Sequence, residues 1–245
     1  HTIGIPNMMN MKARIFPILA LACLSLSSCL SYDADEFTGR IMPRVASYTS
    51  GVTNDWIYFN LRTGEVFNRT APNQEIKEGE QKNRLDWDIA FCGYHVRTNS
   101  GTSGNGKGGA IDLGYGDYDR WQHIDQLPKG QGWVVDDDKT VKITYSQSDW
   151  FRYVNTHGLD PKENPWFDPN NGPQRTLTSA NPLLERNMFL SGPPMTYTPS
   201  YHVYAVRTAD GKHYFKLQII SWYNQHTEID DTGGQMSYYC DELKQ

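Results

Sequence analysis

The chain has 245 residues, of which 23 are Lys or Arg and 28 are Asp or Glu, so its formal net charge is −5. Because phosphate contacts need clustered basic groups in excess, this balance argues against a nucleic-acid partner. Aromatic residues make up 13% of the chain although its mean hydropathy is only −0.64, and this composition excludes a disordered chain, a coiled coil, a collagen-like rod and a membrane-spanning bundle.

The N-terminal region predicts export and a lipid anchor. A basic start with Lys12 and Arg14 precedes an apolar run over residues 15–26, which is too short for a spanning helix but suits a signal peptide. The run ends in Leu-Ser-Ser-Cys, which is similar to a bacterial lipobox. We therefore expect residues 1–28 to be upstream residues plus signal peptide, and Cys29 to be lipidated. An ordinary secretory signal with an incidental cysteine is the alternative.

Removal of the signal would leave 217 residues with a net charge of −7. Three carboxylates follow within seven residues of Cys29 and are similar to the acidic tag that sends lipoproteins of Bacteroidota to the outer surface, although a solvated acidic tether is an equal alternative. We expect residues 29–44 to be the lipidated tether and residues 45–245 to be a single domain. Cys92 and Cys240 remain, and the sequence leaves open whether they pair.

Alternation of apolar and polar residues at period two recurs through the mature chain, whereas helical spacing never persists beyond about two turns. This pattern predicts an all-β domain of antiparallel sheets. Two hairpins are expected, residues 56–61 with 65–67 around Gly64, and residues 201–208 with 212–223 around Ala209-Asp210-Gly211. Leu85–Arg97 is expected to be one long central strand with Trp87, Ile89 and Phe91 on one face, and shorter strands are expected at residues 110–113, 133–136, 139–145 and 235–240.

Three further segments are interpreted as turns or loops. Residues 99–109 match a phosphate-binding G-x-x-x-x-G-K pattern, but Lys107 is followed by Gly and no helix follows, so a flexible loop is expected instead. Asp136-Asp137-Asp138 is interpreted as a hairpin turn rather than a Ca²⁺ site. Residues 150–194 carry seven prolines and are expected to form a long irregular segment, which on a compact domain is often functional.

No motif that pairs a nucleophile with a base is present, so no enzyme is expected. His95, His202 and His213 lie in predicted strands and are expected to be packed or solvent-facing rather than ligands. The aromatic content favours a flat ligand, such as a sugar or a porphyrin, held by stacking.

A porphyrin would add a stricter demand, because its iron needs an axial donor that projects into an apolar slot. The candidates in the irregular segment are His157, Met188 and Met195. By default each of these residues would instead be an apolar filler or a surface side chain.

Four stretches of the chain resemble the HmuY family of haem-binding lipoproteins. They are residues 56–66, the Asp-Trp-Asp strand from Asp86 to Asn99, the Gly/Lys loop Ser103–Ala110, and Thr196–Gln218 with its Ala209-Asp210-Gly211 turn. The resemblance implies an all-β protein that is anchored by lipid to the outer membrane of Bacteroidota, facing outward. It also implies that haem b is captured as cargo, with no metal beyond the haem iron, and is passed to a TonB-dependent outer-membrane receptor.

The resemblance also implies where iron is held, because the family uses two axial His or Met side chains. An ungapped correspondence places these positions near Asp149 or Trp150 and near Leu190, none of which ligates iron well. A shift of several residues brings His157 to the first position and Met188 or Met195 to the second, with the methionines preferred. Trp150 and Tyr197 are expected to form walls of the haem pocket.

Two other functions remain open at this point. The first is a glycan-binding surface lipoprotein, in which exposed rings stack on sugars. The second is a structural or adhesive surface protein without an iron ligand.

Overall fold

The computed structural model describes residues 37–41, 56–67, 75–77, 79–144, 175–193, 196–223 and 233–245. By contacts within the chain, residues 1–38 and 39–245 form two units, and every strand of the described residues lies in the second. The described residues contain antiparallel strands and short 3₁₀ helices, so the predicted all-β antiparallel fold is confirmed.

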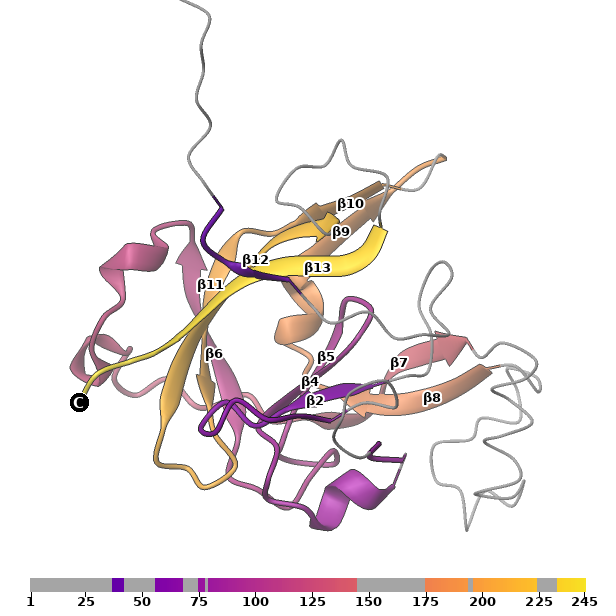
Figure 1. The fold of residues 1–245 in the computed structure, drawn as a ribbon, viewed down its shortest axis with the longest axis horizontal. Helices are drawn as coiled ribbons and strands as arrows, with labels where there is room; N and C mark the ends of the chain where they lie inside the picture. Colours follow the sequence, from indigo (N-terminus) through magenta and orange to yellow (C-terminus); the bar gives the residue numbers. More distant parts are fainter. Residues whose placement is uncertain are drawn as a thin grey trace, which may run out of the picture. The chain divides into compact units, whose positions relative to one another are not determined.

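Two sheets form the body of the second unit (Figure 1). The five-stranded sheet has the order β1 (Arg40–Ile41), β13 (Gly233–Glu242), β12 (Tyr214–Tyr223), β11 (His202–Arg207) and β6 (Gly109–Tyr115). The four-stranded sheet has the order β3 (Val66–Phe67), β2 (Ile57–Phe59), β4 (Ile89–Cys92) and β5 (His95–Thr98). Two separate ribbons pair β7 (Asp137–Thr144) with β8 (Arg175–Ala180), and β9 (Met188–Ser191) with β10 (Thr196–Pro199). The 3₁₀ helices are η1 (Glu80–Asn83), η2 (Tyr118–Arg120), η3 (Ile124–Gln126) and η5 (Leu184–Asn187).

The main hydrophobic core joins the two sheets. Alternate residues of β2, β4 and β5 meet alternate residues of β11, β12 and β13, because successive side chains of a strand point to opposite faces. The buried members from the two sheets include Ile57, Phe59, Ile89, Phe91, Val96, Tyr204, Val206, Phe215, Leu217, Ile219, Met236 and Tyr238. The opposite face of the four-stranded sheet is also buried, by a second cluster that contains Tyr58, Trp87, Ala90 and Cys92. Strand β4 is therefore covered on both faces, as its sequence predicts.

Both predicted hairpins are present. Strands β2 and β3 pair around Gly64, whose φ is 79°, and β11 and β12 pair around Gly211, whose φ is 72°. These positive φ values are the reason that a residue without Cβ occurs at each turn. The predicted last strand is β13, which extends two residues beyond Cys240.

The prediction of one long strand over Leu85–Arg97 is wrong. The chain reverses at Gly93, where φ is 58°, and β4 and β5 pair as a hairpin with Phe91 opposite Val96. Trp87 also lies in the second cluster rather than on the face of Ile89 and Phe91. The sequence does not reveal this turn, because the strand before it and the strand after it are both buried.

One prediction about a strand and two about loops are corrected as well. Residues 133–136 form only an isolated bridge from Val134 to Ala110, and Asp137 begins β7 instead of lying in a turn. The described residues 175–193 of the predicted irregular segment form β8, η5 and β9. Pairing with β7 and β10, which the local sequence does not encode, orders them.

Candidate functional site

The β9–β10 hairpin carries apolar side chains that the core does not cover. Phe189 is 63% exposed and Leu190 is 41% exposed. The register pairs Leu190 with Tyr197 and Met188 with Pro199, so these four residues share one face of the hairpin. That face begins in the core at Met188 and continues outward to Leu190, which leaves an apolar surface at the outer part of the hairpin.

Aromatic rings support this surface. Tyr197 stacks on Trp222, with ring centroids 4.6 Å apart and an interplanar angle of 17°. Tyr94 completes the cluster, at 5.7 Å from Trp222 and 6.0 Å from Tyr197. Desolvation, with a smaller contribution from the charge of Glu185, raises the pKa of Tyr94. Strand β10 packs on β12, which brings the three rings together beside the hairpin. We call Tyr94, Tyr197 and Trp222 the aromatic base of the hairpin.

The start of the hairpin is fixed by η5, which precedes β9 directly. Glu185 accepts a hydrogen bond from Val96 N at 2.8 Å, and its other oxygen lies 2.7 Å from His95 Nδ1. The side-chain amide of Asn187 donates to the carbonyl of Tyr94 at 2.8 Å. These contacts bind η5 to the β4–β5 turn, so the position at which β9 leaves the core is set by the four-stranded sheet.

Only two of the residues predicted to form the site, Met188 and Tyr197, lie within the described part of the chain. Met188 is 6% exposed and belongs to the main core, and Tyr197 is half-buried in the aromatic cluster. The remaining predicted site residues, Met195, His157, Trp150 and Cys29, lie outside the described residues. The sequence analysis missed Trp222 and Tyr94 as partners of Tyr197, since only tertiary packing brings them together.

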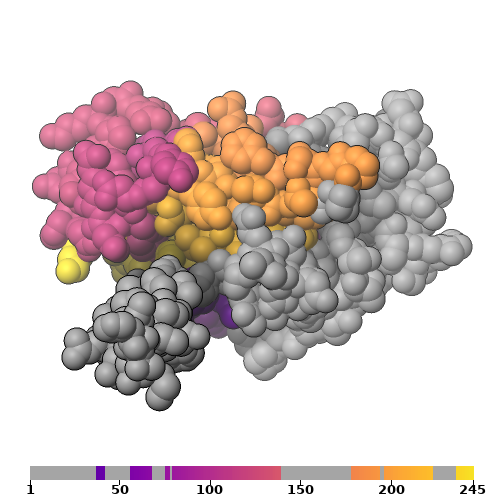
Figure 2. Space-filling model, turned by 90° about the horizontal axis from the view of Figure 1, so that it is seen from above, coloured from indigo at the N-terminus to yellow at the C-terminus, as the bar shows by residue number. Residues whose placement is uncertain are grey.

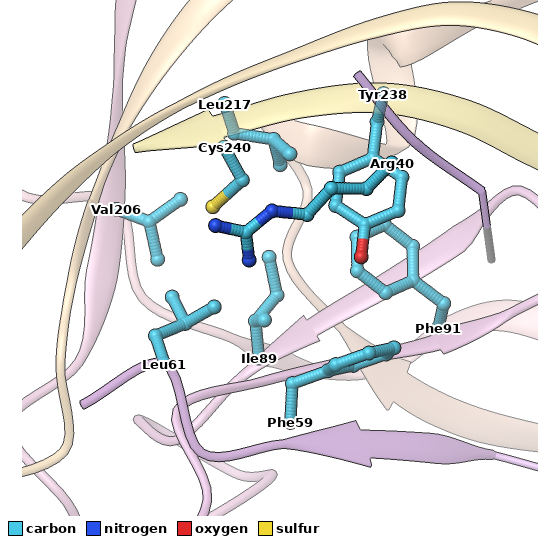
Figure 3. A pocket seen from close by; sticks show the side chains of 9 residues that line it. All are labelled: Arg40, Phe59, Leu61, Ile89, Phe91, Val206, Leu217, Tyr238 and Cys240. Carbon is cyan, nitrogen blue, oxygen red and sulfur yellow. The ribbon is translucent and has the colours of Figure 1, made fainter. Parts of the chain in front are cut away.

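A small cavity between the two sheets is separate from this surface. Its volume is about 20 Å³, and Phe59, Ile89, Leu217 and Cys240 are among the residues that line it. Figure 3 shows the guanidinium of Arg40, from β1, directed toward this space. A cavity of this size holds one water molecule, whereas pockets for small-molecule ligands measure about 300–1,000 Å³.

Burial raises the pKa of the Cys240 thiol beside this cavity to about 12. Cys92 and Cys240 are both buried and form no disulfide with each other.

The Gly-rich loop after β5 is a packed structure rather than a flexible or phosphate-binding loop. The loop folds around buried Asn99, whose side-chain oxygen accepts a hydrogen bond from Gly106 N at 3.0 Å. A Cβ on Gly104, Gly106 or Gly108 would lie 2.1 Å, 2.7 Å or 2.6 Å from an atom of Asn99. The glycines are therefore explained by the close approach of the loop to the backbone and side chain of Asn99, and the expectation of a flexible loop is wrong.

Buried Asp136 is the centre of a polar network. It accepts hydrogen bonds from Thr98 N at 3.0 Å, Asn181 Nδ2 at 3.0 Å and the Thr98 hydroxyl at 2.5 Å. Burial nevertheless raises the pKa of Asp136 to about 6. Among the described residues, no three His, Cys, Asp or Glu side chains gather where they could hold a metal ion.

The three histidines that the sequence places in strands all pair with carboxylates, which the sequence does not indicate, and His213 lies just before β12 rather than in it. His95 pairs with Glu185, His202 with Asp112, and His213 with Glu242, at 2.7 Å, 3.0 Å and 2.8 Å. Each partner comes from a different element, so sequence spacing could not reveal the pairs.

Within the described ranges, no helix has the length and apolar character needed to cross a membrane.

Comparisons with known proteins agree with this architecture. The apo PinO protein of Porphyromonas gingivitis has a TM-score of 0.51 and 18% identity, over 85% of this chain and 99% of that one. The apo HmuY analogue of Tannerella forsythia has a TM-score of 0.50 and 18% identity, over 87% of this chain and all of that one. A Bacteroides vulgatus structure described as a HmuY-like haem-binding protein has a TM-score of 0.47 and 22% identity, over 75% and 82% of the two chains. No curated protein gives a significant match.

The family comparison matches one contiguous part of the sequence. The model of the HmuY protein family matches residues 52–240, which include both sheets apart from β1 and the last residues of β13. The matched region also contains the β9–β10 hairpin and its aromatic base. The chain therefore belongs to the HmuY family.

Proposed function

We propose that this protein captures haem on the apolar surface formed by the β9–β10 hairpin and its aromatic base. The observation that carries the proposal is the exposure of Leu190 on the same face of the hairpin as Tyr197, which stacks on Trp222. A porphyrin is flat and largely apolar, so burying it against such a surface removes apolar area from both partners. The HmuY family is a family of haem-binding proteins rather than enzymes, which agrees with the expectation that this chain catalyses no reaction.

For the iron, we propose Met195 as the preferred axial donor. It precedes β10 directly in the sequence, in the segment that connects β9 to β10. Met188 is the weaker candidate, because its side chain is packed in the core and only 6% exposed. His157 remains the candidate for a second donor, with Trp150 and Tyr197 packing against the ring. A thioether or imidazole would hold iron without any chemical step.

The cellular context of the proposal follows from the N-terminal sequence. Lipidation at Cys29 would anchor the protein to the outer membrane, and the acidic residues after it would favour the outward-facing side. The captured haem would then be passed to a TonB-dependent receptor. Receptor transfer is tested by measuring haem loss from the loaded protein in the presence and absence of outer-membrane vesicles from the producing cells.

Titration of the full chain with haemin, followed by the Soret band, tests capture and ligation together. Met195→Leu should weaken haemin binding by about tenfold or more, since loss of a group that only orients a metal ligand already costs about 10–100-fold. Met188→Leu is the matched control, because it removes a thioether but keeps the core volume. Met188→Leu should leave the Soret band unchanged.

Metal-free protoporphyrin separates ring binding from iron ligation. We expect it to bind the parent chain and Met195→Leu equally, because neither complex has an iron bond to lose. Absence of a Soret change with the parent chain, for oxidised and for reduced haem, would contradict haem capture. It would favour a glycan-binding or adhesive role instead.

A further inference from the structure

Buried His95 contacts both the aromatic base and the segment from which the β9–β10 hairpin starts. Its ring centroid lies 4.4 Å from that of Tyr94, at an interplanar angle of 44°. Its Nδ1 lies 2.7 Å from a carboxylate oxygen of Glu185, which belongs to η5. One imidazole therefore joins the two parts of the structure that support the proposed haem-binding surface.

Both strands of the hairpin are connected to this point through η5. The last residue of η5 is Asn187, which precedes β9 directly and donates a side-chain hydrogen bond to the carbonyl of Tyr94. The carbonyl of Asn187 accepts a hydrogen bond of 2.7 Å from the backbone N–H of Ser200, the residue after β10. Figure 2 shows the hairpin, in orange, at the surface of the molecule. A shift of η5 against the β4–β5 turn would therefore move both strands.

Glu185 fixes η5 against the edge of the four-stranded sheet. Strand β5 is the last strand of that sheet, and Glu185 accepts a hydrogen bond of 2.8 Å from Val96 N on its open edge. The carbonyl of Val96 accepts a second bond, of 2.9 Å, from Asn181 N. One oxygen of Glu185 thus binds the backbone of β5 and the other binds His95, so both serve the contact between η5 and the sheet.

The charge at this contact depends on His95, because histidine is the side chain that ordinarily changes its charge between pH 5 and 8. Among the described residues, Glu185 is the only carboxylate within 4 Å of a nitrogen of this ring. Cys92 lies opposite His95 in β4, Tyr94 contacts its ring, and Arg97 lies two residues along on the same face of β5. Burial and Arg97 oppose protonation of the ring, whereas the adjacent carboxylate favours it.

Protonation would strengthen the contact. It converts the hydrogen bond between a neutral ring and a carboxylate into an ion pair, and the side chains of His95 and Glu185 are only 9% and 15% exposed. Solvent and salt screen such a pair less than they screen a pair at the surface. The attachment of η5 to β5 should therefore become firmer as the pH falls.

We infer that His95 and Glu185 are positioning residues for haem capture, and that the protonated pair holds the hairpin and Tyr94 in the haem-binding arrangement more firmly than the unprotonated pair does. This inference rests on the proposed function, because it concerns the regulation of the same surface. Haem affinity should accordingly rise as the pH falls through the range in which histidine titrates. Bound haem should in turn favour the protonated ring by the same factor, since such coupling is reciprocal.

His213 provides the matched comparison. Its Nδ1 pairs with Glu242 at 2.8 Å, so it is also a histidine beside a carboxylate. This pair joins the turn between β11 and β12 to β13, and it has no contact with η5 or with the aromatic base among the described residues.

Haemin titration of the full chain at pH 6 and at pH 8 tests the inference. The quantity compared is the Kd of a variant divided by the Kd of the parent chain at the same pH, because this ratio removes the effects of pH on haemin itself. His95→Asn keeps a donor toward Glu185 but cannot be protonated, so its ratio should be about fivefold higher at pH 6 than at pH 8. His213→Asn should give the same ratio at both pH values.

Replacement of Glu185 gives an independent measurement. Glu185→Ala removes the acceptor of Val96 N and should weaken haemin binding by about tenfold at pH 8. Glu185→Gln keeps an acceptor without the charge, so it should bind haemin more tightly than Glu185→Ala at pH 8. Its ratio should nevertheless rise toward pH 6 as that of His95→Asn does, because its neutral amide cannot pair with an imidazolium.

The outcomes separate the inference from the proposed function. If the parent chain binds haemin and the ratios of His95→Asn and Glu185→Gln are the same at both pH values, the inference is overturned while haem capture stands. If the parent chain binds no haemin, both are overturned. Thermal unfolding at each pH checks the fold of every variant, and Glu185→Gln alone decides if His95→Asn does not fold.

Discussion

Tyr197 and Trp222 lie in a parallel stack, 4.6 Å between ring centroids, although they belong to β10 and β12. This pair joins an apolar hairpin to the end of the five-stranded sheet. Trp222 is buried and Tyr197 is half-buried, so the stack lies at the boundary between the core and the exposed surface. Tyr197 thus connects the buried core to the surface that would contact a bound macrocycle.

Replacement of Tyr197 should loosen the hairpin. Tyr197→Ser should lower the free energy of unfolding by about 2 kcal/mol, since a half-buried ring and its stacking partner are lost. Phe189→Ser, on the opposite face of the same hairpin, should change stability by about 0.5 kcal/mol or less, because Phe189 is 63% exposed. Urea denaturation of both variants measures the difference, and equal losses would show that the stack contributes nothing.

The glycines around Asn99 give a second prediction. Gly106→Ala should destabilise the protein by about 1–3 kcal/mol, because the added Cβ would lie 2.7 Å from the carbonyl oxygen of Asn99. Gly132→Ala is the control, since its Cβ would have no atom within 4 Å, and it should change stability by about 0.5 kcal/mol or less. Similar thermal midpoints for the two variants would argue for a flexible loop.

Asp88 connects the turns of two hairpins. Its carboxylate accepts hydrogen bonds from Leu61 N and Ala209 N, both at 2.8 Å, and pairs with Arg62 at 3.2 Å. Asp88→Ala should cost about 3 kcal/mol of stability, because it leaves buried donors without an acceptor. Asp86→Ala removes a partly exposed partner of Arg84 and should cost about 1 kcal/mol or less. A loss no larger for Asp88→Ala than for Asp86→Ala would contradict this role.

Asp136 predicts a pH dependence of stability. Burial raises its pKa from 3.8 to about 6, so between these pH values the folded chain binds more protons at this site than the unfolded chain. The contribution of Asp136 to stability therefore falls as pH rises through this window, by about 3 kcal/mol in total. Asp136→Asn should abolish this contribution.

The difference in unfolding free energy between the parent chain and Asp136→Asn, measured from pH 4 to 7, tests the assignment. We expect the parent chain to lose stability relative to the variant as pH rises. A difference that stays constant across this range would mean that Asp136 titrates normally in the folded protein.

The elements that the sequence predicted are those with a local signal. Gly64 and Gly211 mark their hairpins because each turn requires a positive φ. The turn at Gly93 was not predicted, because apolar residues continue across it. Strand β8 was not predicted, because its partner β7 is more than thirty residues away in the sequence. Alternation reveals a strand but not its neighbour, so sheet order had to come from the structure.

The candidate site was predictable only in part. Tyr197 was singled out by resemblance, whereas its contact with Trp222 depends on how β10 packs against β12. The burial of Met188 agrees with the default interpretation of such a methionine as an apolar filler, although its segment carries no clear period. The pairing of His202 with Asp112 could not be foreseen, since it depends on a bulge at Leu113 that has no sequence signal.

Amide hydrogen exchange of the full chain, with and without one equivalent of haemin, tests haem capture at the hairpin most directly. The account predicts slower exchange in residues 188–199 when haemin is present, with no change in the distant hairpin of β2 and β3. Unchanged exchange in residues 188–199, under conditions where the Soret band shows that haemin is bound, would contradict it.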